Sequence, residues 1–237
     1  MKSYKGIIFD LDGVICTTDS YHYKAWKKIA DRLNIPFSEA DNSRLRGVSR
    51  RESLEIILER YSGQPLTDSE KEQLCDVKND IYRESLQQLS SVDINETVVE
   101  TLNQLKALGY QLAIGSSSRN TEMILKKLGL FEQFDAISDG TKITHSKPHP
   151  EVFLLAADLL GVKPQECLVV EDAISGVEAG HAGGFKVACV GDASQKEAGD
   201  FNMKRLLDLL KVIDGGDKNG KTIGCFGWNC RNWEGNF

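Results

Sequence analysis

Short apolar runs alternate with amphipathic segments along the second half of the chain. Runs of strand length occupy residues 112–114, 134–138, 167–170 and 186–190, and the run at 167–170 indicates a buried strand. Segments with helical periodicity, several of them ended by glycine, lie at residues 98–108, 120–128, 150–160, 174–182 and 203–213. Strands that alternate with helices predict a parallel sheet with right-handed crossovers.

The first half of the chain has one strand and then only helical patterns. Residues 6–9 form an apolar run that is too short for a helix. Four helical segments follow, at residues 19–33, 38–45, 49–61 and 67–89, and nothing strand-like occurs between residues 17 and 92. A helical insert at this point of an α/β pattern indicates a cap over the active face. We therefore expect a Rossmann-like α/β core with a parallel sheet, formed by residues 1–16 and 93–213, and an inserted α-helical cap, formed by residues 17–92.

The final segment, residues 214–237, changes character. Glycine and asparagine are frequent there, and neither helical nor strand periodicity is present. We expect a flexible tail, and the alternative is that Trp228 and Trp233 contact the core.

Composition narrows the class of protein. A hydrophobic content of 41% and a charged content of 27% are typical of a globular protein, and a net charge of −6 argues against nucleic-acid binding. No apolar run approaches the roughly 20 residues needed to span a bilayer. The six cysteines lack Cys-x-x-Cys spacing, which favours reduced thiols. We expect a cytoplasmic protein, monomeric, with neither nucleic-acid nor membrane partners.

Two carboxylates follow the first strand directly. Asp10 and Asp12 would share one face if the extended backbone continued, and Gly13 then allows the chain to turn away. Open α/β sheets bind ligands at this end of their strands. Two acids this close raise each other's pKa, so either one of them is protonated or a cation lies between them. Taken alone, such a pair is more often a turn or a helix cap.

Three later strand ends carry further polar groups. Ser116, Ser117 and Ser118 follow one strand at a helix start, where free N–H groups favour an anion. Lys147 precedes a proline, and Glu171 and Asp172 end the buried strand at 167–170. In isolation, Ser118 is more often a plain helix cap and Lys147 a solvated loop lysine.

Together, these residues predict a metal and phosphate site. Asp10, Asp12 and Asp172 offer oxygen ligands to a hard cation, for which Mg²⁺ is the natural choice. Ser116 and Lys147 would bind phosphate oxygens. This set describes phosphoryl transfer to an aspartate.

The motifs also resemble those of a known family. Four core motifs resemble the haloacid dehalogenase superfamily: Asp10-Leu11-Asp12-Gly13, Ser116-Ser117, Lys147-Pro148 and Glu171-Asp172. Four narrower motifs resemble the β-phosphoglucomutase family: Tyr21-His22-Tyr23-Lys24-Ala25-Trp26, Arg46-Gly47-Val48-Ser49-Arg50, Lys78-Asn79-Asp80 and Ser118-Arg119-Asn120. The resemblance extends from Lys5 to about Ile213.

The resemblance implies a role for each core position. Asp10 would be the nucleophile, and Asp12 the general acid–base. The implied Mg²⁺ ligands are Asp10, Asp172 and the backbone carbonyl of Asp12, with Glu171 supporting the metal through water. Ser116, the amide of Ser117 and Lys147 would bind the transferring phosphoryl group.

The cap motifs and the residues after Ser117 are implied to bind the rest of the substrate. The second phosphate would be bound by Arg50, Ser118, Arg119 and Asn120. His22, Trp26 and Lys78 would lie near the sugar. One position departs from the pattern, because this chain has Thr17-Thr18 where much of the family has an Asp-Thr or Asp-Ser pair. Hinge contacts made by that acid are therefore not implied here.

The resemblance implies a β-phosphoglucomutase activity on a small sugar phosphate. Such an enzyme interconverts β-D-glucose 1-phosphate and glucose 6-phosphate through an aspartyl phosphate and a 1,6-bisphosphate. The main alternative is a phosphatase for a small sugar or polyol phosphate, which passes the phosphoryl group to water. A catalytically silent sugar-phosphate sensor is disfavoured, because Asp10, Asp12 and Lys147 are all present.

Overall fold

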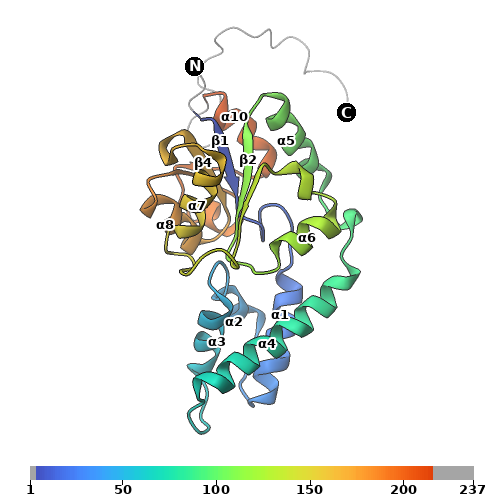
Figure 1. The fold of residues 1–237 in the computed structure, drawn as a ribbon. Helices are drawn as coiled ribbons and strands as arrows, with labels where there is room; N and C mark the ends of the chain where they lie inside the picture. Colours follow the sequence, from blue (N-terminus) through green and yellow to red (C-terminus); the bar gives the residue numbers. More distant parts are fainter. Residues whose placement is uncertain (1–3, 216–237) are drawn as a thin grey trace.

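The computed structural model describes residues 4–215, and Figure 1 shows an α/β core with a group of helices below it. The expectations for residues 216–237, including Trp228 and Trp233, lie outside the described residues. The described helices include none that is both long and apolar enough to cross a bilayer.

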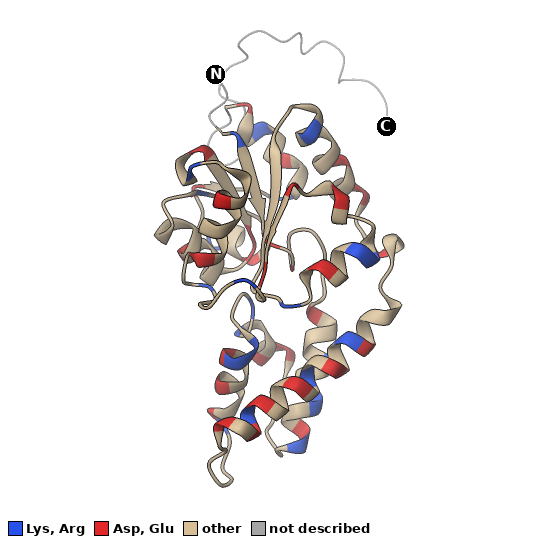
Figure 2. Ribbon diagram, in the orientation of Figure 1, with Lys and Arg blue, Asp and Glu red and all other residues tan. Residues whose placement is uncertain are grey.

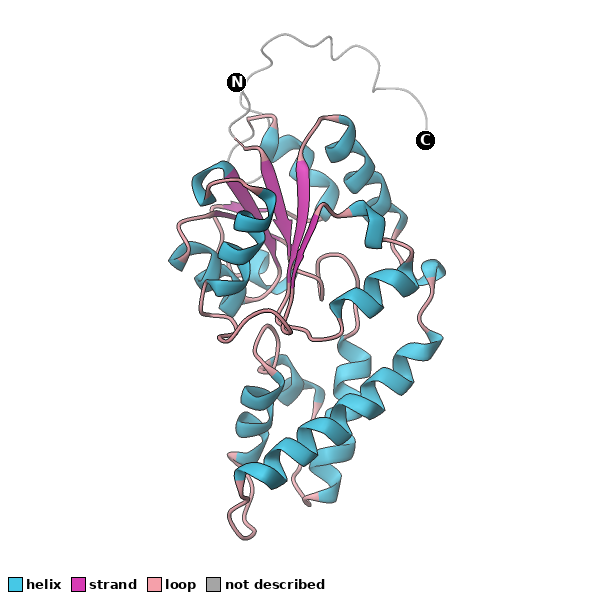
Figure 3. Cartoon of the chain, viewed as in Figure 1, coloured by secondary structure: helices cyan, strands magenta, loops and turns pink. Residues whose placement is uncertain are grey.

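A six-stranded parallel sheet forms the centre of the described core (Figure 3). Its strands are β1 (Gly6–Phe9), β2 (Gln111–Gly115), β3 (Ala136–Ser138), β4 (Cys167–Glu171), β5 (Lys186–Cys189) and β6 (Phe201–Asn202). Their order is β3-β2-β1-β4-β5-β6, so β1 pairs with β2 on one side and β4 on the other. The chain reverses direction across the sheet between β1 and β4, and ligands of open α/β sheets bind at such a point.

Side chains alternate across the sheet, so each face has its own apolar cluster. Ile7 and Phe9 of β1 belong to one cluster, together with helices α5 (Glu96–Ala107), α6 (Thr121–Leu128) and α10 (Leu209–Ile213). Ile8 belongs to the other, with helices α7 (Glu151–Leu160) and α8 (Ile174–Ala182). The strands are therefore buried on both faces, as expected for a parallel sheet.

The segment between β1 and α5 is helical, as its periodicity predicts. It contains α1 (Asp19–Arg32), α2 (Glu39–Ser43), α3 (Arg50–Leu58) and α4 (Asp68–Ser85), followed by the short 3₁₀ turns η1 (Leu86–Gln88) and η2 (Ser91–Asp93). Capping boxes at Ser38, Ser49 and Thr67 begin α2, α3 and α4. These helices have an apolar cluster of their own, which includes Trp26, Leu54 and Cys75. The Rossmann-like core with a helical cap is thus confirmed, and we propose the limits 17–92 for the cap.

The last predicted helix, residues 203–213, is wrong over its first half. Residues Phe201–Asn202 form strand β6, and the amide of Met203 donates to the carbonyl of Cys189 (2.8 Å). This pairing with β5 keeps the backbone extended, so the chain passes through a 3₁₀ turn (Leu206–Asp208) before α10 begins at Leu209. The short helix α9 (Gly191–Gln195) was also not predicted.

Charges of both signs are interspersed over the cap helices. Figure 2 shows Lys and Arg alternating with Asp and Glu along α3 and α4. Several of these residues form ion pairs, for example Arg51 with Glu55 and Lys71 with Glu55. Mixed charge of this kind lacks the clustered basic residues of a nucleic-acid-binding face.

Candidate active site

The ends of β1 and β4 bring two acids together. The amide of Asp10 donates to the carbonyl of Val170 (2.9 Å), so the chain stays beside β4 for one residue beyond β1. Gly13 then turns with φ +89°, and a Cβ built there would lie 2.1 Å from the Asp172 carboxylate. Glycine is thus required both by the backbone conformation and by the approach of Asp172.

Lys147 lies buried between two of the predicted acidic residues. Its ammonium donates to Asp10 and to Glu171 (2.6 Å for the latter), and its side chain is fully buried. Burial lowers the pKa of Lys147, but the carboxylates of Asp10 and Glu171 raise it by more, so the lysine is charged. The two Glu171 oxygens are occupied, one by Lys147 and the other by the amides of Asp172 and Ala173 (2.7 and 2.8 Å).

Three carboxylates share this buried region with one ammonium. Ligand oxygens of Asp10, Glu171 and Asp172 lie within 4.8 Å of one another. Burial raises the pKa of both Asp10 and Asp172, and Glu171 raises each further. Because Lys147 balances only one of the three negative charges, a divalent cation fits the donor set. Asp10 and Asp172 have oxygens available to bind it directly.

Asp12 is held away from this cluster by Thr18. Its carboxylate accepts hydrogen bonds from the amide (2.9 Å) and the hydroxyl of Thr18, and the same hydroxyl contacts Tyr82 (2.8 Å). Burial within the site raises the pKa of Asp12, although the bonds from Thr18 oppose the shift. A carboxyl with a raised pKa is suited to exchange a proton with a sugar oxygen.

His22 faces Asp12 from the first cap helix. Its Nε2 is 3.8 Å from the Asp12 carboxylate, and its Nδ1 is 2.8 Å from the Lys78 ammonium. Burial lowers the pKa of His22 well below its ordinary value, and Lys78 and Arg50 lower it further. The imidazole is therefore neutral, and a Lys78 N–H donated to Nδ1 places the imidazole proton on Nε2, facing Asp12.

Trp26 occupies a supporting position below Lys78. It is 1% exposed, and the Lys78 ammonium lies 4.9 Å from the centre of its ring. Tyr82 contacts the same ammonium from 4.7 Å. The two rings stabilise a buried cation without competing for its hydrogen bonds.

The loop after β2 presents hydroxyls and amides at the start of α6. The Ser116 hydroxyl accepts from the Ser118 amide, and the Ser118 hydroxyl accepts from the Asn120 amide (both 3.2 Å). The Ser117 hydroxyl donates to the carbonyl of Gly47 in the cap (3.1 Å). The two bonds within the loop hold it in a tight conformation at the edge of the sheet, and the Ser117 bond joins it to the cap.

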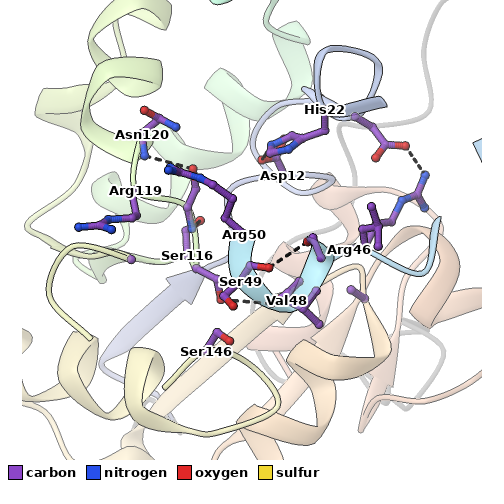
Figure 4. A pocket seen from close by; sticks show the side chains of 18 of the residues that line it. Asp12, His22, Arg46, Val48, Ser49, Arg50, Ser116, Arg119, Asn120 and Ser146 are labelled. Carbon is purple, nitrogen blue, oxygen red and sulfur yellow. Dashed lines mark hydrogen bonds and ion pairs between the residues drawn. The ribbon is translucent and has the colours of Figure 1, made fainter. Parts of the chain in front are cut away.

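Arg50 reaches this loop from the cap through an asparagine. Its guanidinium donates to the side-chain oxygen of Asn79 (2.8 Å), and the side-chain amide of Asn120 donates to the same oxygen (2.9 Å). Figure 4 shows Arg50 directed toward Asn120, whereas Arg119 is directed away from Arg50. Of the predicted distal group, Arg50 and Asn120 are thus joined through Asn79, and Arg119 lies at the edge.

One cavity of about 500 Å³ connects these groups. Its lining includes nearly all of the predicted site residues (Figure 4): Asp10, Asp12, His22, Trp26, Arg50, Lys78, Ser116, Ser117, Ser118, Arg119, Asn120, Glu171 and Asp172. Lys147 reaches the site through its contact with Asp10. The volume lies in the range of small-molecule sites, roughly 300–1,000 Å³.

Sequence reasoning missed the residues that join cap and core. Asn79 stands inside a motif quoted above, but its bridging position depends on how the cap sits. Arg46 pairs with Asp192 of the core and Asp19 of α1 (both 2.7 Å), and Glu52 accepts from Ser146, the residue before Lys147. The only sequence signal for a role of these residues was that they lie within a recognised motif or next to one.

Comparison with known proteins assigns the fold to a family. A family model described as haloacid dehalogenase-like hydrolase matches residues 4–184. The chain belongs to this family. Residues 4–184 include all of the strand-end residues described above, so the haloacid dehalogenase-like resemblance of the motifs is confirmed.

Individual relatives include both mutases and phosphatases. A β-phosphoglucomutase from Bacillus subtilis is 39% identical over 207 residues, covering 86% of this chain and 91% of the relative. A fructose-1-phosphate phosphatase from Escherichia coli is 31% identical over 188 residues, covering 78% and 95%. The crystal structure of a β-phosphoglucomutase from Clostridium difficile has a TM-score of 0.81 at 34% identity, covering 87% of this chain and 93% of that one. The resemblance to β-phosphoglucomutase is confirmed, and phosphoryl transfer is the reaction class supported.

Proposed function

We propose that this protein is a cytoplasmic, monomeric β-phosphoglucomutase. It would interconvert β-D-glucose 1-phosphate and D-glucose 6-phosphate through a phosphorylated Asp10 and a bound 1,6-bisphosphate. The observation that supports the proposal is that one site holds two separate clusters of cationic and N–H donor groups. Lys147 and the 116–118 loop would bind a phosphate at the Asp10 end, and Arg50 with Asn120 would bind one at the other end.

Each group would act on a defined atom. In the first step, phosphorylated Asp10 transfers its phosphoryl group to the free hydroxyl of the bound β-glucose 1-phosphate. The bond from phosphorus to the sugar oxygen forms as the bond from phosphorus to Asp10 breaks, and Asp12 takes the hydroxyl proton. Lys147 and the N–H groups of the 116–118 loop balance the charge on the phosphoryl oxygens. His22, held neutral by burial and by Lys78, orients Asp12. The bisphosphate formed in this way then turns end for end. An oxygen of Asp10 attacks the phosphorus of its other phosphate, the bond from that phosphorus to the sugar oxygen breaks, and Asp12 returns the proton to the leaving oxygen, so that glucose 6-phosphate is released and Asp10 is phosphorylated again.

Mg²⁺ is the cation proposed for the buried carboxylates. Asp10 and Asp172 would bind it directly, with the carbonyl of Asp12 and, through water, Glu171 completing the set. When bound, the ion neutralises charge that develops on the transferring phosphoryl group. Asp172 is held in place for this role by its contact with Gly13 and by the end of β4.

Arg50→Ala tests the second phosphate group. A phosphorus NMR time course on β-glucose 1-phosphate, with a bisphosphate primer, should show isomerisation lowered by roughly 30- to 150-fold. This is the scale for loss of a charge-assisted contact worth roughly 2–3 kcal/mol. Hydrolysis of a small aryl phosphate, which needs only the Asp10 end, should change little.

A cap arginine outside the cavity provides the control. Arg60 pairs with Asp41 (2.8 Å), and Arg60→Ala should leave both reactions near wild type. The mutase proposal fails if Arg50→Ala isomerises normally. It also fails if the wild-type protein releases inorganic phosphate from β-glucose 1-phosphate faster than it forms glucose 6-phosphate.

The second candidate is a phosphatase for a small sugar phosphate. The similarity to the Escherichia coli phosphatase favours it, because the same aspartate would transfer its phosphoryl group to water. In the time course above it predicts steady release of inorganic phosphate, so one experiment separates the two functions.

A further inference from the structure

Two histidines flank the catalytic lysine on the outer side of its loop. The segment reads His145-Ser146-Lys147-Pro148-His149-Pro150-Glu151, and the lysine side chain points inward to Asp10. The His145 and His149 side chains are 64% and 51% exposed. The proposed phosphoryl transfer uses neither histidine, so the two side chains are available for another role.

The backbone brings the two rings to the same carboxylate. The amide of His149 donates to the carbonyl of Ser146 (3.0 Å), which closes a turn and leaves the ring centres 4.6 Å apart. One oxygen of Glu151 lies 3.0 Å from Nδ1 of His145 and 3.9 Å from Nδ1 of His149. All three ligand atoms lie within 4.8 Å of one another.

Glu151 is fixed at the start of α7. One of its oxygens accepts from the amide of Thr144 (2.9 Å), and the other accepts from the amide of His145 (2.8 Å). These bonds lower the pKa of Glu151, so its carboxylate is charged. The prolines at 148 and 150 restrict the backbone between the ligands. Because Glu151 and this backbone are already restrained, binding of a metal ion would lose less conformational entropy than at a flexible loop.

The donor set selects a different class of ion from the active site. Two imidazoles and one carboxylate match Zn²⁺ and related transition metals, whereas Mg²⁺ prefers oxygen ligands alone. Three protein ligands on an exposed surface leave a fourth position for water. Access is direct, because both rings face solvent.

We propose that His145, His149 and Glu151 form a second metal site, for a divalent transition metal such as Zn²⁺. The ion would join the two sides of the lysine loop to the first turn of α7. Its occupancy would therefore restrain the loop that carries Lys147 and contacts the cap through Ser146 and Glu52.

Calorimetric titration of Zn²⁺ into the full chain saturated with Mg²⁺ tests the proposal. The chain should carry Cys225→Ser and Cys230→Ser, so that thiolates near its end do not take up the metal. At about pH 7.5, one equivalent of Zn²⁺ should bind. His145→Ala and His149→Ala should each weaken this binding at least tenfold, and Asp172→Asn should not alter it.

Co²⁺ and a matched histidine complete the test. Co²⁺ in this site should give visible absorption bands that His149→Ala removes. His181, another exposed histidine paired with a carboxylate (Asp200, 3.0 Å), is the control, and His181→Ala should keep full binding. The proposal is overturned if the Mg²⁺-saturated serine background takes up no Zn²⁺. It is equally overturned if His145→Ala and His149→Ala bind like the background protein.

Discussion

Lys78 is the clearest example of a residue that serves the proposed function at a cost in stability. It is 3% exposed, and its ammonium is near Trp26, Tyr82 and His22 but forms no ion pair among the described residues. Burial, and after it the charge of Arg50, lowers its pKa from 10.5 to about 7. The unfolded chain therefore binds more protons than the folded chain between these pH values. This lysine costs most stability below pH 7, and the cost disappears as the pH rises toward 10.5.

Lys78→Met should accordingly stabilise the substrate-free protein, and more so at low pH. At about pH 6 we expect the melting temperature to rise by at least about 3 °C, roughly 1 kcal/mol for a chain of this size. At about pH 9.5 the gain should be smaller. Thermal unfolding at both values measures this. Lys71, on the same helix but paired with Glu55, is the control, because Lys71→Met should bring no stabilisation at either pH.

At the scale of elements, the local hydrophobic pattern predicted most of the helices. The prediction failed where the backbone conformation depends on pairing with a strand that is distant in the sequence. Three of the cap helices, α2, α3 and α4, begin at capping boxes that are visible in the sequence, such as Ser49 with Glu52. The end of the core differs, because Phe201–Asn202 is extended by its pairing with β5. No periodicity within residues 201–208 reports that contact. Short edge elements of this kind are set by tertiary structure rather than by local propensity.

Helix α8 provides a prediction at the same scale. A Cβ on Gly176 would lie 1.8 Å from the Glu171 carboxylate, so α8 approaches β4 closely only because this residue lacks a side chain. Gly176→Ala should lose about 1–3 kcal/mol, despite the better helix propensity of alanine, and the melting temperature should fall by about 4 °C or more. Glu178→Ala, on the exposed side of α8, should stay within about 0.5 kcal/mol of wild type. Equal stability of the two variants would contradict this packing.

At the scale of the whole molecule, the sequence predicted the sheet end of the site better than the cap end. Parallel strands bring their carboxyl ends to one edge, so Asp10, Ser116 and Asp172 had to meet once the strands were recognised. The cap residues were placed by resemblance. The bridge from Arg50 through Asn79 to Asn120 was not predicted, because it depends on two parts of the chain closing on each other.

Closure of the cap leads to a further prediction. Arg46 holds the cap loop to Asp192 of the core and to Asp19, and both pairs are partly exposed. Arg46→Ala should raise the KM for the sugar phosphate about three- to tenfold, the loss expected for two such pairs. It should also raise the ratio of phosphate release to isomerisation, because water gains access to the phosphorylated Asp10. Arg44→Ala removes a pair with Glu59 that lies within the cap and should change neither quantity. An unchanged ratio in Arg46→Ala would show that this pair does not control water access.

The central place of β1 in the sheet also constrains how the chain is completed on the ribosome. The apolar cluster of the cap draws its members from residues before β2, so the cap has its own partners early in synthesis. Strand β1 is made first, yet both of its neighbours, Gln111–Gly115 and Cys167–Glu171, are made much later. This strand, which leads directly into Asp10, therefore emerges unpaired and apolar, and both of its neighbours are present only after more than half of the chain has been made. The cap follows β1 directly in the sequence and can fold early. Once it has folded, only a short segment around β1 stays extended and able to contact other chains.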